Sequence, residues 1–67
     1  MSDEQAIEVI HLRHRLRAMA AVAAFDREVI QTLERFRDLS EALDDVDLRF
    51  EHARWRVHFE EIGALQC

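Results

Sequence analysis

The most basic part of the sequence is the segment 11–17, in which Arg13, Arg15 and Arg17 occupy alternate positions. Such a cluster of positive charge could grip the phosphates of a nucleic-acid backbone. No aromatic side chain alternates with the arginines, as base stacking would require. We therefore favour a second interpretation, in which the segment is a solvated helix face that pairs with acidic residues of this chain or of a second copy.

Four histidines raise the question of a metal site. His11 and His14 share a helix face, but His52 and His58 lie far away along the expected fold. The sequence contains neither a His-Glu-x-x-His nor a Cys-x-x-Cys pattern. We predict no metal and no cofactor, and leave open only a site formed between subunits by His11 and His14.

The sequence offers no nucleophile with a base beside it. The only serines are Ser2 and Ser40, and the single cysteine is Cys67, at the last position. We predict that the protein is not an enzyme and has no small-molecule substrate. With one cysteine no intramolecular disulfide can form, and a reducing, cytoplasmic location is the simplest expectation.

Composition indicates a small, patterned, helical protein. Of the 67 residues, 49% are hydrophobic and 34% are charged, with no proline and one glycine. The net charge of −5 argues weakly against a protein devoted to nucleic acid. The longest apolar run, Ala18 to Phe25, is too short to span a bilayer, and the acidic amino end does not resemble a signal peptide, so we expect no membrane association.

Heptad spacing predicts a long first helix, from about residue 3 to residue 37. Its apolar seam is spaced alternately three and four residues apart, which is typical of a helix packed lengthwise on another helix. The alanine-rich centre would allow close approach of a neighbour, and we place Asp26 at the edge of the seam, in contact with water. The seam consists of Val9, Leu12, Leu16, Met19, Ala23, Asp26, Ile30 and Leu33.

A second apolar stripe, out of phase with the first, predicts a second helix over about residues 41–62. We place the turn around residues 37–40, where Asp38 and Glu41 have the spacing of a capping box. Gly63 suits a left-handed C-terminal cap. The predicted fold is all-α: a single-domain, two-helix antiparallel hairpin spanning 1–67, with one long coiled-coil helix as the alternative. The second stripe consists of Leu39, Leu43, Val46, Phe50, Ala53 and Val57.

Such a hairpin leaves apolar surface uncovered at two places. The start of the first helix overhangs the shorter second helix, and the second helix carries a further apolar face around Trp55. We predict that these residues bind a partner, with Trp55 as the energetic anchor, and that association as an antiparallel homodimer forms a four-helix bundle. The predicted partner-binding residues are Ile7, Ile10, Leu12, Leu48, Trp55, Phe59 and Ile62.

Two likenesses to known proteins are slight. Residues 39–44 resemble the Ser-Gln-Glu-Leu-Asp signature of small helical aspartyl-phosphate phosphatases, except that Glu41 and Ala42 replace its Gln and Glu. In size and layout the chain is also similar to the Rop-type RNA-binding hairpin dimers. We assign the chain to no family. The predicted function is a non-enzymatic protein–protein interaction module, acting as a regulator, adaptor or small chaperone. The alternative is a dimeric nucleic-acid-binding regulator that uses the segment 11–17.

Overall fold

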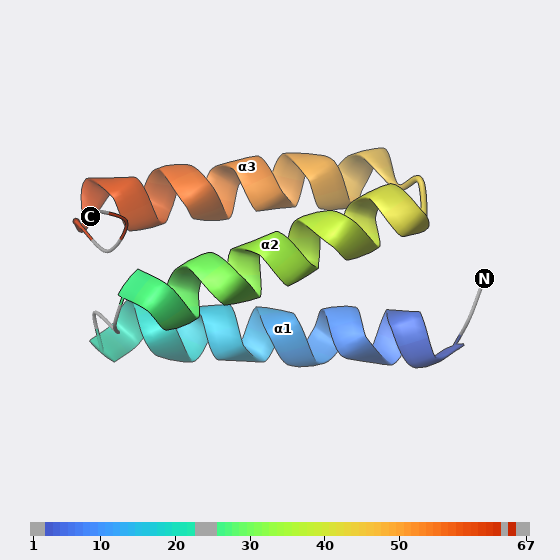
Figure 1. Cartoon of the computed structure of the whole chain (residues 1–67), viewed down its shortest axis with the longest axis horizontal. Helices are drawn as coiled ribbons and strands as arrows, with labels where there is room; N and C mark the ends of the chain where they lie inside the picture. Colours follow the sequence, from blue (N-terminus) through green and yellow to red (C-terminus); the bar gives the residue numbers. More distant parts are fainter. Residues whose placement is uncertain (1–2, 23–25, 64, 66–67) are drawn as a thin grey trace.

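The described residues fold as three helices, which follow one another in up-down-up order (Figure 1). In this computed structural model, which describes residues 3–22, 26–63 and 65, they are α1 (Asp3–Val22), α2 (Asp26–Ala42) and α3 (Val46–Glu61). α1 and α3 run in the same direction, and α2 runs oppositely and crosses obliquely between them in the view of Figure 1. The described part of the chain contains no strand. The prediction of an all-α protein is therefore confirmed.

The two-helix hairpin was wrong, as was the single long helix. The expected first helix of residues 3–37 is divided: α1 ends at Val22 and α2 begins at Asp26. No glycine or proline marks this break, and the heptad spacing runs through it by coincidence, which hid the reversal. The acidic pair Asp26 and Glu28, which suits the first turn of a new helix, was the available signal. The side chain of Asp26 and the whole of Ala23 lie outside the described residues.

The turn predicted at residues 37–40 was also misplaced, because α2 continues through that region to Ala42. The helix ends instead in a Schellman motif. The amide of Asp45 donates to the carbonyl of Ser40 (3.1 Å), and the amide of Asp44 donates to that of Glu41 (3.1 Å). Asp44 has the positive φ of 48° that this motif requires, a conformation that aspartate tolerates better than most residues.

Asp45, rather than Asp38, caps the following helix. Its Oδ1 accepts hydrogen bonds from the amides of Asp47 (2.9 Å) and Leu48 (3.3 Å), which have no partner within α3. Asp47 adds negative charge to the first turn of α3. The acidic residues 44–47 therefore end one helix and start the next, while Gly63, with φ of 79°, follows α3 at the predicted position.

All three helices contribute to one core. Every third or fourth residue of α1 from Val9 to Met19 is buried, so this part of the predicted seam does face the interior. In α2 the buried polar residues Thr32 and Ser40 donate their hydroxyls to the carbonyls of Glu28 and Arg37, at 2.8 and 2.6 Å. The buried apolar residues are Val9, Leu12, Leu16, Met19, Val29, Leu33, Phe36, Leu39, Leu48 and Phe59.

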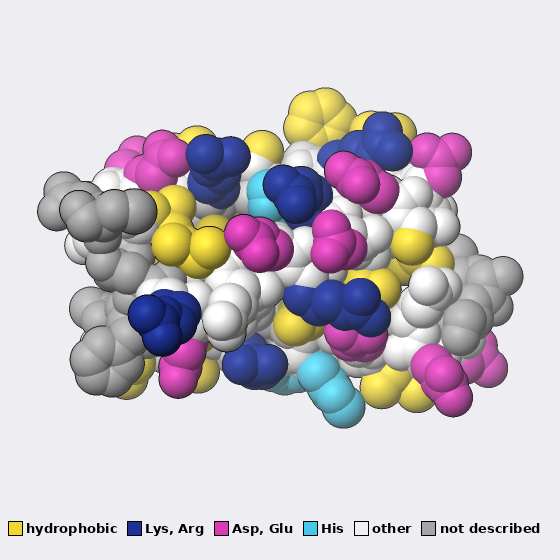
Figure 2. All heavy atoms as spheres, in the orientation of Figure 1, with side chains coloured by type: hydrophobic (Ala, Val, Ile, Leu, Met, Phe, Trp, Pro, Cys, Tyr) yellow, Lys and Arg dark blue, Asp and Glu magenta, His cyan; other side chains and the backbone are white. Residues whose placement is uncertain are grey.

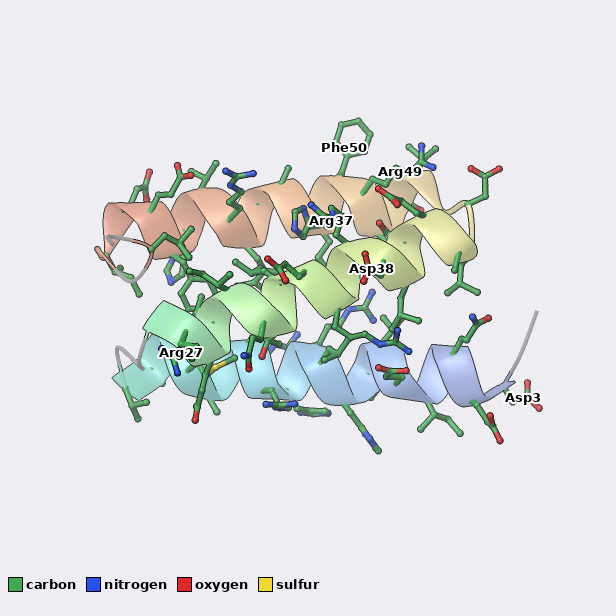
Figure 3. The ribbon with its side chains drawn as sticks, in the orientation of Figure 1. Asp3, Arg27, Arg37, Asp38, Arg49 and Phe50 are labelled. Carbon is green, nitrogen blue, oxygen red and sulfur yellow. The ribbon has the colours of Figure 1, made fainter. Side chains whose placement is uncertain are left out.

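The orientation of α3 is the reverse of the prediction. We expected its stripe through Val46, Phe50 and Val57 to pack on the first helix, but all three side chains are exposed. Leu48 and Phe59, on the other side, are buried instead. In Figure 3 Phe50 extends from α3 away from both other helices. The helix was assigned to the wrong face because both of its faces carry apolar residues at helical spacing.

Candidate functional site

A groove of about 720 Å³ runs between α1 and α3. Three residues of α1 line one side, at one-turn intervals, and four residues of α3 line the other. The groove combines three arginines, one carboxylate and the only tryptophan of the chain. Its lining residues are Arg13, Arg17, Ala20, Glu51, Arg54, Trp55 and His58.

Glu51 organises one part of this groove. The Nε of Arg13 donates to both Glu51 carboxylate oxygens, at 3.0 and 2.8 Å, and Nη2 lies 2.8 Å from Oε1. The indole Nε1 of Trp55 donates to Oε2 of the same carboxylate, at 3.2 Å. Burial acts to raise the pKa of Glu51, but the hydrogen bonds from Arg13 and Trp55 and the charges of Arg13 and Arg54 outweigh it, so the pKa is lowered. Glu51 is therefore held as a carboxylate that fixes both neighbours.

The remaining cationic side chains of the groove lie on both of its sides. Within the described parts of the chain, neither Arg17 of α1 nor Arg54 of α3 forms an ion pair. Trp55 is half-buried and stacks on Phe59, with ring centroids 5.9 Å apart. The rings of Trp55 and His58 are nearly perpendicular, with centroids 6.1 Å apart. The groove thus carries three arginines against one carboxylate, next to an aromatic ring that contacts within the fold hold in place.

The outer face of α3 is a second candidate surface. Val46, Phe50 and Val57 are 58%, 66% and 52% exposed, and Ala53, also exposed, lies between them. Their spacing of four, three and four residues places all four on one side of the helix. Figure 2 shows charges of both signs spread over the visible face of the molecule, with hydrophobic side chains among them. We call Val46, Phe50, Ala53 and Val57 the outer stripe.

A smaller groove of about 500 Å³ lies between α2 and α3. Arg37, Arg56 and His52 line it together with the carboxylates Glu34 and Glu60, so the two signs of charge are mixed. Burial lowers the pKa of His52, and the nearby positive charges of Arg37 and Arg56 lower it further. The lowered pKa disfavours the cationic form of His52, and the two arginines balance the two carboxylates, so this groove offers no surplus of either charge.

The structure distributes the predicted partner-binding residues over three environments. Leu12, Leu48 and Phe59 are buried in the core of the single chain, so they form no part of its surface. Trp55 is half-buried, and it lines the groove between α1 and α3. The exposed members are Ile7, Ile10 and Ile62.

The predicted basic segment is divided between two sides of α1. Arg13 and Arg17 are one turn apart and line the groove, but Arg13 is engaged by Glu51. Arg15, two residues away from each, points from another side of the helix. His11 and His14 are exposed, and the described residues contain no group of three or more side chains that could hold a metal ion.

Sequence reasoning missed two features of these surfaces. It did not bring Arg54 and Trp55 next to Arg17, because that requires α1 and α3 to be neighbours, which a two-helix fold does not provide in this register. It also assigned the outer stripe to the core. The signal for the groove was the spacing of Arg13, Arg17 and Ala20, which marks one continuous side of α1.

Comparisons with known proteins give no family. No protein-family profile matches the chain, no curated protein matches it, and no solved structure matches it. Among the helices that the structure describes, none combines the length and the apolar character needed to cross a membrane.

Proposed function

We propose that the protein is a small interaction module that binds an amphipathic helix of a partner protein along the outer stripe of α3. The observation that supports this function is the exposure of Phe50, which is 66% accessible at the centre of a continuous apolar line. Scattered apolar residues on a surface are ordinary, but four that line one side of a helix match the surface that helix-in-groove and helix-on-helix recognition use. This surface replaces the one predicted around Leu48 and Phe59.

The charges beside the stripe favour a partner with acidic flanks. Arg49, Arg54 and Arg56 flank its middle on the two sides, and the acidic residues of α3 beside the stripe lie toward its ends. Arg49 and Arg56 form ion pairs with Asp44 and Glu60, both at 3.4 Å. These pairs are exposed and contribute little, so a partner's carboxylates can replace them at small cost.

A second copy of the chain fits the stripe less well. An antiparallel pair with Phe50 against Ala53 would place Asp47 near Arg54 on one flank, which is favourable. On the other flank it would place Arg49 near Arg56, which is repulsive. The gain and the loss are similar, so charge supplies no preference for self-association. A helix of another protein with glutamates at its flanks gains on both sides.

The size of the stripe implies a weak, reversible complex. From Val46 to Val57 it extends about 17 Å along α3. A standard interface buries about 800 Å² on each partner, which is a large share of the 4812 Å² that this chain exposes. One short helix covers less than that standard area, so we expect affinity in the micromolar range or weaker.

Two synthetic helical peptides of about 18 residues test the proposal. Both carry leucine at the heptad core positions, and one carries glutamate and the other lysine at the flanking positions. We expect calorimetry to detect binding of the glutamate peptide, weaker at high salt, and no binding of the lysine peptide. Phe50→Ala should weaken binding about tenfold, because a buried Phe side chain contributes about 1.5–3 kcal/mol. Ile10→Ala, which removes an exposed apolar side chain of α1, is the control and should have no effect.

Equal binding of both peptides, or equal loss in Phe50→Ala and Ile10→Ala, would contradict the proposed surface. The mass of the chain alone in solution, measured by analytical ultracentrifugation, tests whether a second copy covers the outer stripe. A dimer that Phe50→Ala converts to a monomer would show that the stripe is covered by a second copy and would overturn the assignment to a different protein.

A further inference from the structure

The groove between α1 and α3 carries more positive charge than the structure itself uses. Arg13 is compensated by Glu51, with contacts of 2.8–3.0 Å. Arg17 and Arg54, from opposite sides of the groove, have no such partner in the described part of the chain. The charge of Arg54 also acts on Glu51, but three arginines against one carboxylate still leave the groove with a surplus of two positive charges. The protein as a whole has a net charge of −5, so the sign of the charge is locally reversed here.

Two guanidinium groups match the charge of one phosphate monoester. Such a group carries about −1.5 to −2 charges at neutral pH and three acceptor oxygens. Arginine binds phosphate with paired N–H donors, so Arg17 and Arg54 can hold the same group from two helices. A carboxylate ligand, with a single charge, would leave one of the two arginines uncompensated.

Trp55 provides the second part of a binding site. Its indole nitrogen is held by Glu51, its ring is stacked on Phe59, and the ring plane of His58 is nearly perpendicular to it. These contacts fix the ring as part of the groove lining before any ligand binds, which lowers the entropic cost of stacking. A planar ring is the ligand group that such a surface accepts most favourably.

We propose that this groove binds a small phosphorylated ligand with a flat ring, of the mononucleotide class. Arg17 and Arg54 hold the phosphate, and Trp55 stacks on the ring. The volume of about 720 Å³ lies within the usual range for small-molecule sites. A nucleic-acid strand fits less well, because a run of phosphates needs a line of cations, and Arg15 points away from the groove.

The chain contains a single tryptophan, so its intrinsic fluorescence reports on this groove alone. We expect adenosine monophosphate at low ionic strength to produce a saturable change in emission. Adenosine has the ring alone, and inorganic phosphate has the charge alone. Each should bind more weakly than adenosine monophosphate by a factor of about ten or more. Salt should weaken the binding of the monophosphate more than that of adenosine.

A matched pair of variants on α1 locates the phosphate. Arg17→Gln removes a charge that faces the groove, and Arg15→Gln makes the same substitution two residues away on another side of the helix. We expect Arg17→Gln to weaken binding of the monophosphate about tenfold, because a hydrogen-bonded charge is lost, and Arg15→Gln to bind like the original protein. Circular dichroism of both variants should show unchanged helix content.

Four results would overturn the assignment. They are the absence of a saturable response to adenosine monophosphate, equal affinity for inorganic phosphate, equal losses in Arg15→Gln and Arg17→Gln, and much tighter binding of a single-stranded oligonucleotide at the same phosphate concentration. The last would identify a nucleic-acid strand as the ligand. Arg54 borders both the groove and the outer stripe, but Arg17 belongs only to the groove and Phe50 only to the stripe. Phe50→Ala should therefore leave this response unchanged, and Arg17→Gln should leave binding of the glutamate peptide unchanged, so the two proposals can fail independently.

Discussion

The inner and outer faces of α3 carry similar side chains in opposite environments. Phe59, on the inner face, is fully buried, whereas Phe50, on the outer face, is 66% exposed. Leu48 and Val46 form a similar contrast at the start of the helix. The local pattern of α3 thus does not determine which face enters the core. The other two helices determine it, since only one side of α3 can contact α1 and α2.

The largest expected effect is on the inner face. Phe59→Ala removes a ring that is completely buried, so it loses the hydrophobic transfer energy and leaves a cavity. We expect it to lower the free energy of unfolding by about 3–5 kcal/mol. For a chain of 67 residues this is a large part of the total stability. Urea unfolding followed by circular dichroism measures the change.

A small loss of stability in Phe59→Ala would contradict the contrast between the buried inner face and the exposed outer face of α3. If Phe59→Ala cost less than about 1 kcal/mol, the inner face could not be packed as in the structure. Phe50→Ala, made in parallel, is the matched control because it makes the same substitution on the same helix.

An intermediate effect is expected at the border between the two faces, where Glu51 accepts hydrogen bonds from Arg13 and Trp55. Glu51→Gln should lower the free energy of unfolding by about 1 kcal/mol. This value is at the upper end of what ion pairs near a surface contribute, because the Glu51 side chain is only 22% exposed. Glu8→Gln, which removes a more exposed partner of Arg35 on α2, should cost less. Equal costs for the two variants would show that the groove position gives Glu51 no advantage.

The same variant has a defined pH dependence. The pKa of Glu51 is lowered in the folded chain, because the bonds from Arg13 and Trp55 outweigh the effect of burial. A lowered carboxyl pKa stabilises the fold above the unfolded value, and this stabilisation is lost as the pH falls through the folded value. The stability difference between the original protein and Glu51→Gln should therefore be constant at neutral pH and shrink below about pH 4.5. A difference that grows on acidification would contradict the lowered pKa.

Part of the fold could be predicted from the sequence because some signals are local. The seam from Val9 to Met19 identified the buried side of α1, and Gly63 marked the end of α3. The reversal near residues 23–25 could not be placed, since alanine favours helix and the heptad spacing continues across it. The turn after α2 depends on Asp44 in a left-handed conformation, which glycine would have signalled more clearly.

The candidate surfaces were less predictable than the helices, because they depend on which helices become neighbours. Arg17 was identified as a candidate from its own segment, and Trp55 from its own helix. Their common groove exists only because the chain reverses twice, so that α1 and α3 run in the same direction and both line the groove. The apolar spacing of the outer stripe could be recognised in the sequence. Whether the stripe faces the core or the solvent could not, because that depends on which helices pack against α3.

The smallest expected effect is that of Phe50→Ala on the isolated chain. It is the most direct test of whether the outer face of α3 is exposed in solution. The exposed ring contributes little packing, and alanine has the higher helix propensity, so the free energy of unfolding should change by no more than about 0.5 kcal/mol. The urea midpoint should also be the same at low and high protein concentration. A loss of 2 kcal/mol or more that grows with concentration would mean that Phe50 is buried by a second copy in solution. If the free energy of unfolding does not change, Phe50 does not contribute to folding or to self-association. This agrees with the proposal that it is buried only when a different partner binds.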